Sequence, residues 1–428
     1  MFFSRRFLPY FITQCLGALN DNVYKNVLLL MVTYASLNNL PMPVNLFVNL
    51  AAGVFILPFL LFSVHAGVIA DHCDKAQLIK RLKWLELVIM CCAAAAMLSQ
   101  SYLLMLLLLF LMGTQSAYFG PVKYALLPQA LAPAELVTAN AWVELGTFLS
   151  ILAGTIAAGV LMSLSNGIEL SAMLVVVLAA FGVCSSQFMQ PLPPSKQQYQ
   201  ASEVGWLQRI RQQPTILIAI LAISWFWFVG AVYLTQFANF TRLYLGAEPS
   251  VVSLLLGLFS VGIAVGSFTA VKLSSAKVEL GILPIGLSGL ALFGIDFMYG
   301  LPTVTQQLEA ISFSQFINQA NYYRTLVDLF MIGVSAGIYI VPLYSFIQQQ
   351  ALAHERSQVI AANNIFNALF MVCAAIISIL WLQVMGLSIV SLFALIAVTN
   401  LIVLILLWGK ADFIKQAIYQ YFKIKSSS

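Results

Sequence analysis

The chain has 428 residues, of which 61% are hydrophobic and only 8% carry a charged side chain. Soluble domains carry roughly 25% charged residues, so this composition excludes an ordinary soluble protein. Apolar stretches of about 20 residues, separated by short polar breaks, indicate a bundle of transmembrane helices, because β-barrel strands would be shorter and alternating. The sequence therefore predicts an all-α polytopic membrane protein.

We predict twelve membrane-spanning helices. Their expected ranges are 7–36, 44–69, 82–99, 102–122, 138–163, 170–190, 214–241, 250–271, 278–299, 325–349, 358–382 and 386–408. A polar, proline-rich break after the sixth divides the chain near its middle. We expect an N-terminal six-helix half at 1–190, a cytoplasmic linker at 191–213, a C-terminal six-helix half at 214–408 and an amphipathic cytoplasmic tail at 409–428.

An internal repeat supports the two halves. The segments YFGPVKYALLPQALA (118–132) and YIVPLYSFIQQQALA (339–353) share a Tyr, a Pro and the tail QALA at one constant offset. After a short slip, TANAWVEL (138–145) aligns with AANNIFNA (361–368). Repeated halves of this kind imply a pseudo-two-fold bundle with a central site.

The basic residues predict the orientation. If both ends of the chain are cytoplasmic, nearly all Lys and Arg residues outside the spans lie on the cytoplasmic side. Only Arg242 and Arg324 then lie on the opposite side. Lys83 then falls on the cytoplasmic side, at the start of the third span. The positive-inside rule favours this arrangement.

The first span is unusually polar. On a helical wheel Gln14, Gly17, Ala18, Asp21 and Lys25 share one stripe, and Asn22 lies beside it. A charge near the bilayer centre costs between ~2.5 and ~15 kcal/mol, so these side chains are expected to face protein or water. Asp21 and Lys25 are spaced to neutralise each other in part. They either lock a helix–helix seam as an ion pair or line a polar path, and we favour the path.

Two further segments carry polar candidates. Lys123 and Tyr124 follow a Gly-Pro pair at the end of the fourth span, where freed backbone groups favour a polar cavity. Asn140 and Glu144 share one face of the fifth span. Glu144 is either a second site residue or a structural contact of Lys123 or Lys25.

The second half offers weaker candidates. Arg324 and Asp328 have the spacing of a structural or gating pair, and Asp296 is expected to be solvated. The aromatic residues of 225–233 could line an apolar tunnel or pack on the lipid-facing side of their helix. Part of 302–324 is expected to lie on the outer surface as a helix. Residues 206–211 and 410–425 predict amphipathic helices on the cytoplasmic membrane surface.

Enzyme signatures are absent from the sequence. His65 and Asp71 miss the spacing of the acyltransferase motif HxxxxD, and no Gly-rich phosphate loop is present. His72, Cys73 and Asp74 lack distant partners for a metal site, and the six cysteines form no CxxC pair. We therefore expect no catalytic residue, no cofactor and no metal. The first apolar segment is too long and too polar for a cleavable signal peptide. We also expect no nucleic-acid partner and a monomeric protein.

The assembled features resemble the Major Facilitator Superfamily. The segment GVIADHCDKAQLIKR (67–81) is similar to its loop motif G-x-x-x-D-(R/K)-x-G-(R/K), with Gly67, Asp71 and Lys75 in matching positions. His72 and Asp74 depart from that motif. The resemblance implies the major facilitator fold and a gating role for this loop.

Within the superfamily the chain resembles bacterial lysophospholipid transporters, some of which are fused to acyltransferase domains. The segments QCLGALNDNVYKN, YFGPVKYALLPQAL, ELVTANAWVELGTFLSILAGT and VPLYSFIQQQALAHERSQVIAANNIFNALFMV carry this resemblance. It implies transport of lysophosphatidylethanolamine and lysophosphatidylglycerol across the bacterial inner membrane by alternating access. A separate cytoplasmic acyltransferase is then a candidate partner, and we expect no fused acyltransferase after Ser428.

Such a headgroup needs opposite charges inside an apolar cavity. We expect Lys25 and Lys123 to meet the phosphate, and Asp21 and Glu144 to meet the amine. Proton-coupled efflux of amphipathic drugs or a siderophore, and a non-transporting lipid receptor, remain open as alternatives.

Overall fold

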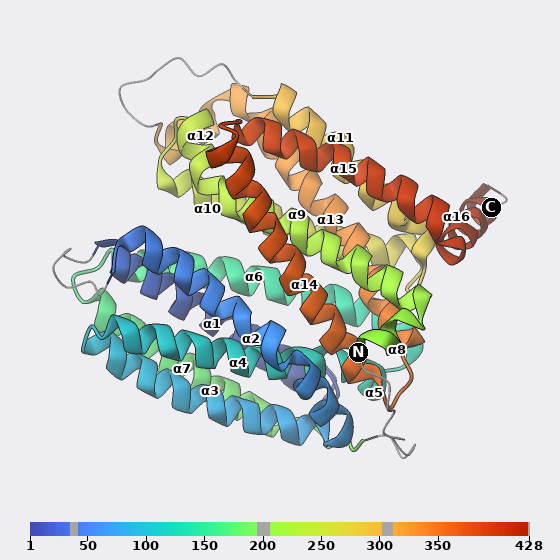
Figure 1. Ribbon diagram of the computed structural model, residues 1–428, viewed down its shortest axis with the longest axis horizontal. Coiled ribbons are helices and arrows are strands. Elements are labelled where there is room, and N and C mark those ends of the chain that lie inside the picture. The colour runs from blue at the N-terminus through green and yellow to red at the C-terminus, as the bar shows by residue number, and fades with distance from the viewer. Residues whose placement is uncertain (35–41, 195–205, 302–310, 427–428) are drawn as a thin grey trace. The chain divides into compact units, whose positions relative to one another are not determined.

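The computed structural model describes residues 1–34, 42–194, 206–301 and 311–426. Within them the chain is almost entirely helical (Figure 1). The long helices are α1 (Leu8–Tyr34), α2 (Val44–His72), α3 (Lys75–Leu98), α4 (Tyr102–Ala125), α6 (Leu136–Met162), α7 (Gly167–Gln187), α9 (Pro214–Tyr244), α10 (Pro249–Leu273), α11 (Leu283–Tyr299), α13 (Tyr323–Gln350), α14 (Arg356–Ile379) and α15 (Ile389–Lys410). Each corresponds to one predicted span.

Ten helices in the described part of the chain are long and apolar enough to cross a membrane. The two long helices outside that set are α1 and α3, which have similar lengths but carry several polar and charged residues. The all-helical membrane fold predicted from the sequence is confirmed. The count of twelve spans is supported for ten helices by composition and stays a prediction for α1 and α3.

Short elements connect the long helices. They are α5 (Leu127–Ala130), α8 (Trp206–Arg211), α12 (Phe313–Asn318), α16 (Asp412–Ser426), the 3-10 turns Pro133–Glu135, Leu280–Ile282 and Ala320–Tyr322, and a π-helical turn at Leu380–Val384. The start of α3 lies earlier than predicted because the Asp74 side chain caps it, accepting a hydrogen bond from the Gln77 backbone N–H at 2.9 Å.

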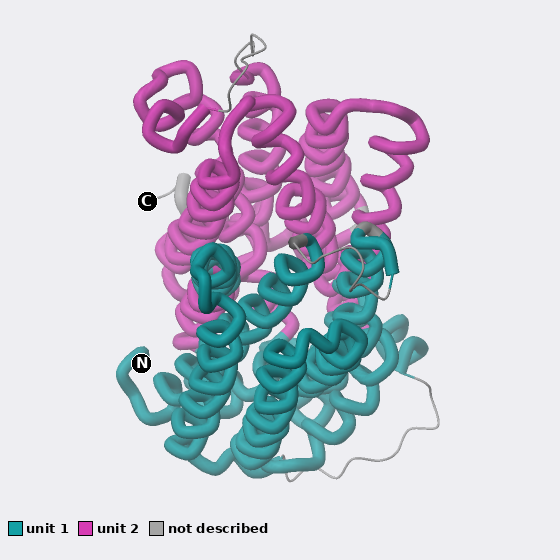
Figure 2. Tube along the Cα trace, turned by 90° about the vertical axis from the view of Figure 1, so that its left-hand side faces the viewer, with its two compact units in different colours: residues 1–133, 149–212, 348–368 teal, residues 134–148, 213–347, 369–428 magenta. Residues whose placement is uncertain are grey.

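The structure divides into two compact units (Figure 2). Unit 1 comprises 1–133, 149–212 and 348–368, and unit 2 comprises 134–148, 213–347 and 369–428. The helices α6 and α14 contribute residues to both units. Division of the chain into two sequential six-helix halves stays a prediction.

Within unit 1, α1 packs on α7, α3 packs on α4 and α7, and α2 packs on α4. An apolar core fills the space between these helices, and it includes Tyr24, Met90, Met105 and Leu109. Tyr24 is fully buried, and its hydroxyl donates to the Met105 backbone carbonyl at 2.7 Å. These contacts hold α1 against α4, and they therefore determine the direction in which the polar face of α1 points within unit 1.

The amphipathic tail differs from the prediction. The apolar face of α16 packs on the turn Leu280–Ile282, with Ile414, Ile418 and Tyr421 buried. The Tyr421 hydroxyl donates to the Leu273 backbone carbonyl at 3.2 Å. An amphipathic pattern shows that a helix has an apolar face but not what covers it, and here protein rather than lipid covers most of that face.

The other two predicted surface helices are present. In unit 1, α8 buries Ile210, and Arg209 forms an ion pair with Glu355 at 3.7 Å. In unit 2, α12 begins with a capping box formed by Ser312 and Gln315, and Phe316 stacks on Tyr322 with ring centroids 4.2 Å apart. The earlier part of the predicted loop, 302–310, lies outside the described residues.

Candidate functional site

Asp21 lies in the middle of α1, within unit 1. Its Oδ2 accepts a hydrogen bond from the Ser116 hydroxyl of α4 at 2.8 Å. Its Oδ1 is buried and has no hydrogen-bond partner among the described residues. A buried carboxylate oxygen without a partner is costly, so this atom is a candidate acceptor for a ligand.

Lys25 does not form an ion pair with Asp21, which was the alternative to the favoured polar path. Its ammonium donates to the Asn22 side-chain oxygen at 3.1 Å and lies 5.8 Å from the centre of the Phe55 ring. Asn22 in turn donates to the Ala18 backbone carbonyl at 2.8 Å. The hydrogen bond from Lys25 to Asn22, three residues earlier, thus replaces an ion pair with Asp21, four residues earlier. The helix-locking pair is therefore not what holds these two charges.

The remaining unit 1 candidates lie toward the start of α1. Tyr10 is buried, and its hydroxyl donates to the Lys123 backbone carbonyl at 2.9 Å, which ties α1 to the end of α4. The Lys123 ammonium lies 5.1 Å from the centre of the Tyr124 ring. Gln14, also buried, donates to the Cys15 sulfur at 3.0 Å. Unit 1 thus holds Gln14, Asp21, Asn22, Lys25, Lys123 and Tyr124.

Asn140 and Glu144 belong to unit 2, on the first half of α6. Both side chains are fully buried. Asn140 donates to the Ser345 hydroxyl of α13 at 3.1 Å and to the Leu136 backbone carbonyl at 3.0 Å. The predicted set is therefore divided between the two units, and the roles assigned to its members stay predictions.

The residues of the predicted gating loop meet the start of α14, within unit 1. Asp71 accepts hydrogen bonds from the backbone N–H groups of Ser357 at 2.9 Å and Gln358 at 3.2 Å. A carboxylate at this position caps the helix and complements its dipole. At Gly67 an added Cβ would lie 2.7 Å from the Ala361 Cβ, so only glycine permits this approach.

Lys75, the third residue of this motif, is also buried. Its ammonium donates to the Ala70 backbone carbonyl at 3.0 Å. Gly67, Asp71 and Lys75 thus lie around one helix end in unit 1. Their gating role stays a prediction.

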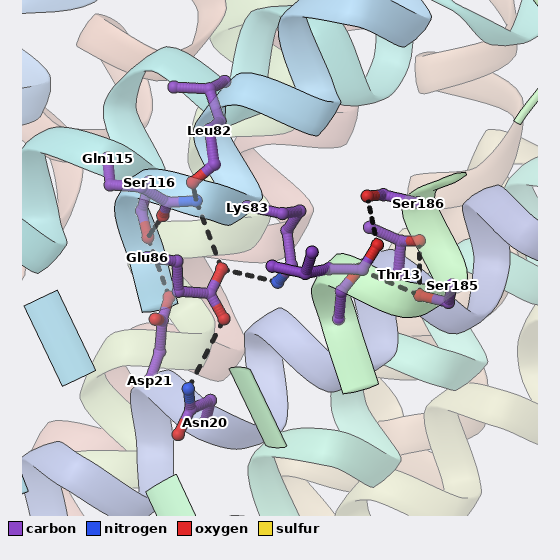
Figure 3. A network of polar contacts seen from close by, with 12 residues as sticks. Thr13, Asn20, Asp21, Leu82, Lys83, Glu86, Gln115, Ser116, Ser185 and Ser186 are labelled. Atoms are coloured by element: carbon purple, nitrogen blue, oxygen red, sulfur yellow. Dashed lines mark hydrogen bonds and ion pairs between the residues drawn. The ribbon is translucent and has the colours of Figure 1, made fainter. Parts of the chain in front are cut away.

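A second polar cluster in unit 1 is not predicted by the sequence patterns (Figure 3). Lys83, expected on the cytoplasmic side at the start of the third span, is fully buried and forms an ion pair with Glu86 at 2.5 Å. Gln115 of α4 donates to the Glu86 Oε2 at 3.2 Å, and Asn20 of α1 donates to its Oε1 at 3.4 Å. The signal available in the sequence was a Lys and a Glu three residues apart within an otherwise apolar stretch.

Arg324 and Asp328 form no close ion pair among the described residues, although their charges interact, and their structural or gating role stays a prediction. Arg324 forms a two-pronged ion pair with Asp296 of α11, which was expected to be solvated without a partner. Asp328 is buried, and its Oδ2 has no hydrogen-bond partner among the described residues. The i, i+4 rule considers only one helix, whereas the planar guanidinium here matches a carboxylate on a neighbouring helix in unit 2.

The aromatic residues of α9 pack inside unit 2. The Trp225 indole donates to the Asn400 side-chain oxygen at 2.8 Å, and the Trp227 indole donates to the Tyr344 hydroxyl at 3.1 Å. Tyr233 stacks on Phe393 with centroids 4.6 Å apart. These side chains therefore pack against protein, and both the tunnel and the lipid-facing alternatives stay untested.

Comparison with known proteins identifies the class. The family model of the Major Facilitator Superfamily matches residues 10–375. The chain therefore belongs to this superfamily, whose members are transporters and not enzymes. The match covers α2 to α13 completely, and with them the Asp71 and Glu86 clusters.

Two related bacterial proteins are both named lysophospholipid transporter LplT. The protein of Pectobacterium carotovorum is 25% identical over 366 residues, which covers 82% of this chain and 80% of that protein. The protein of Serratia proteamaculans is 22% identical over 363 residues, with 81% of each chain covered.

Solved structures agree on the fold. The major facilitator transporter FucP, in an outward conformation, superposes with a TM-score of 0.68 at 13% identity, covering 94% of this chain and 98% of that one. A bacterial homologue of the iron transporter ferroportin, in an outward-facing state, gives a TM-score of 0.64 at 15% identity, covering 97% and 99%. At these identities the likeness concerns the fold.

Proposed function

We propose that this protein transports lysophospholipids across the bacterial inner membrane by alternating access. The observation that carries the proposal is the unpartnered Oδ1 of Asp21, which is buried in unit 1 on the same helix as Lys25 and one helical turn before it. An acceptor and a cation on one helix match the ammonium and phosphate of a zwitterionic headgroup. The two relatives named as lysophospholipid transporters support this substrate class.

The proposed roles follow from charge. Lys25 and Lys123 bind the phosphate, and Asp21 binds the amine or a hydroxyl group of the headgroup. Glu144 remains a candidate for the same role as Asp21. We propose that both termini are cytoplasmic and that the protein is a monomer that delivers lysophospholipid to a separate acyltransferase.

The test is uptake of labelled lysophosphatidylethanolamine into the inner leaflet of spheroplasts. A hydrogen bond to a charged group contributes about 1.5–3 kcal/mol, so Asp21→Asn should lower uptake by about tenfold or more. The matched control is Asp412→Asn, which makes the same change at an exposed residue at the start of α16 and should leave uptake unchanged.

Two results would contradict the proposal. Equal uptake by the wild type and Asp21→Asn would show that the site assignment is wrong. Absence of lysophospholipid uptake by the wild type, together with extrusion of an amphipathic dye driven by a proton gradient, would replace the proposed function with drug efflux.

A further inference from the structure

The buried ion pair of α3 has no role in the proposed function as stated. Lys83 and Glu86 are only 1% and 2% exposed, and both lie in unit 1. Desolvating two charges is expensive, and a buried pair often stabilises a fold no better than well-packed apolar residues would. A pair held this deeply inside a helix bundle therefore calls for an explanation other than stability.

Two glycines provide the space for the Lys83 side chain. A Cβ at residue 182 of α7 would lie 2.9 Å from the Lys83 Nζ, and a Cβ at residue 17 of α1 would lie 3.2 Å from the same atom. Real Cβ atoms approach other heavy atoms this closely only with strain. The packing of α1 and α7 around α3 is thus shaped to this one ammonium group, which reaches Glu86.

Glu86 orients the amide of Gln115. The carboxylate can only accept hydrogen bonds, so the Gln115 NH2 group faces it at 3.2 Å and also donates to the Leu82 backbone carbonyl at 3.3 Å. This leaves the Gln115 side-chain oxygen toward the Ser116 hydroxyl, at 3.4 Å. The Glu86 carboxylate and the Leu82 carbonyl, which both only accept, together determine which atom Gln115 presents to Ser116.

Ser116 connects this chain of contacts to Asp21. Its hydroxyl has one hydrogen and two acceptors within reach, the Asp21 Oδ2 at 2.8 Å and the Gln115 oxygen at 3.4 Å. The shorter contact goes to Asp21. Because its single hydrogen goes to Asp21, the Ser116 hydroxyl meets the Gln115 oxygen only as a second acceptor (Figure 3). The connection from Glu86 to Asp21 is therefore one of position: Glu86 holds Gln115, and Gln115 directly precedes Ser116 on α4.

We propose that Lys83 and Glu86 are positioning residues for headgroup binding, holding the Asp21 carboxylate through Gln115 and Ser116 so that its Oδ1 is left for the substrate. The inference rests on the proposed function, because the ligand of Asp21 is the headgroup. Asn20 strengthens the connection, since it precedes Asp21 on α1 and donates to Glu86 at 3.4 Å. The pair thus acts on the substrate without touching it.

The decisive variant is the double substitution Lys83→Met with Glu86→Gln. It removes both charges at nearly constant volume, so the net charge is unchanged and the interior keeps its shape. The new amide at residue 86 can donate as well as accept, so it holds Gln115 less firmly and leaves it the 3.3 Å hydrogen bond to the Leu82 carbonyl. We expect the KM for lysophosphatidylethanolamine uptake to rise about tenfold, the factor for weakening one hydrogen bond to a charged group. The maximal rate per folded transporter should stay the same.

Repeating the double substitution in the Ser116→Ala variant tests whether Lys83 and Glu86 position Asp21 or only stabilise the fold. Ser116→Ala removes the hydrogen bond to Asp21, so the double substitution should cause no further change in KM when it is added to this variant. A structural role would instead lower the amount of folded protein and leave the KM unchanged. The matched control is Thr155→Val, which breaks the 3.1 Å hydrogen bond from Asn26 in the same unit and should leave the KM at the wild-type value.

The failures of the two proposals are distinguishable. Uptake by the wild type that is impaired by Asp21→Asn, with an unchanged KM in the double variant, overturns this inference alone. The inference would also be overturned if the KM changes caused by Ser116→Ala and by the double substitution were additive. Absence of saturable uptake by the wild type overturns the proposed function, and this inference with it.

Discussion

Two ion pairs, one in each unit, use similar side chains in opposite surroundings. Lys83 and Glu86 in unit 1 are 1% and 2% exposed, whereas Arg324 and Asp296 in unit 2 are 51% and 41% exposed. The buried pair is surrounded by Asn20 and Gln115, which satisfy the carboxylate. The exposed pair is a two-pronged contact between neighbouring helices in unit 2.

The difference shows that forming an ion pair does not by itself determine how much stability is lost when one of the two charges is removed. Water screens an exposed pair, so each partner can be removed at little cost. In a dry interior, removal of one partner leaves the other without compensation. The effects of substitution should therefore separate the two pairs clearly.

The largest effect is expected for Lys83→Met alone. It leaves Glu86 buried without its counter-charge, at a cost of about 3–5 kcal/mol in the free energy of unfolding. Adding Glu86→Gln should recover most of that loss, because both charges are then gone. Denaturant titration in detergent micelles measures both values. A single variant no less stable than the double variant would contradict the comparison.

An intermediate effect is expected for Gly182→Ala, which tests the space around the Lys83 ammonium. The added methyl group overlaps that side chain, and overpacking of this kind costs about 1–3 kcal/mol. Gly53→Ala in α2 is the matched control, since no heavy atom of the described residues lies within 4 Å of the added Cβ. Melting temperatures of the two variants are compared. Equal melting temperatures would mean that Lys83 moves aside freely.

The smallest effect is expected for Arg324→Gln. Its ion pair with Asp296 is open to solvent, so the melting temperature should stay at the wild-type value at ordinary salt. Repeating the measurement at low and high salt is the control, since screening removes what little the pair contributes. A loss as large as that of Lys83→Met would erase the distinction between the two pairs.

The sequence predicts the helices well because the apolar stretches are long and the breaks between them are polar. It also singles out Asp21, whose charge contrasts with the apolar residues around it. The loop motif points to Gly67 and Asp71, and the structure places both of these α2 residues against the start of α14.

The differences between prediction and structure arise where tertiary contacts or local capping decide the outcome. The apolar pattern places Lys83 at the start of a span, because it does not show that the Asp74 cap starts α3 several residues earlier. The partners of Arg324 and Lys25 depend on which side chain is nearest in space, while spacing along one helix offers only a single choice. The cover of the α16 apolar face is likewise set by tertiary packing.

The space around Lys83 also bears on how this family can diverge. Losing either charge alone is costly, while losing both is mild, so replacements at positions 83 and 86 should occur together in evolution. Larger residues at positions 17 and 182 should accompany only those lineages in which the lysine is gone. Across relatives as distant as 22–25% identity, the four positions are expected to covary as one group.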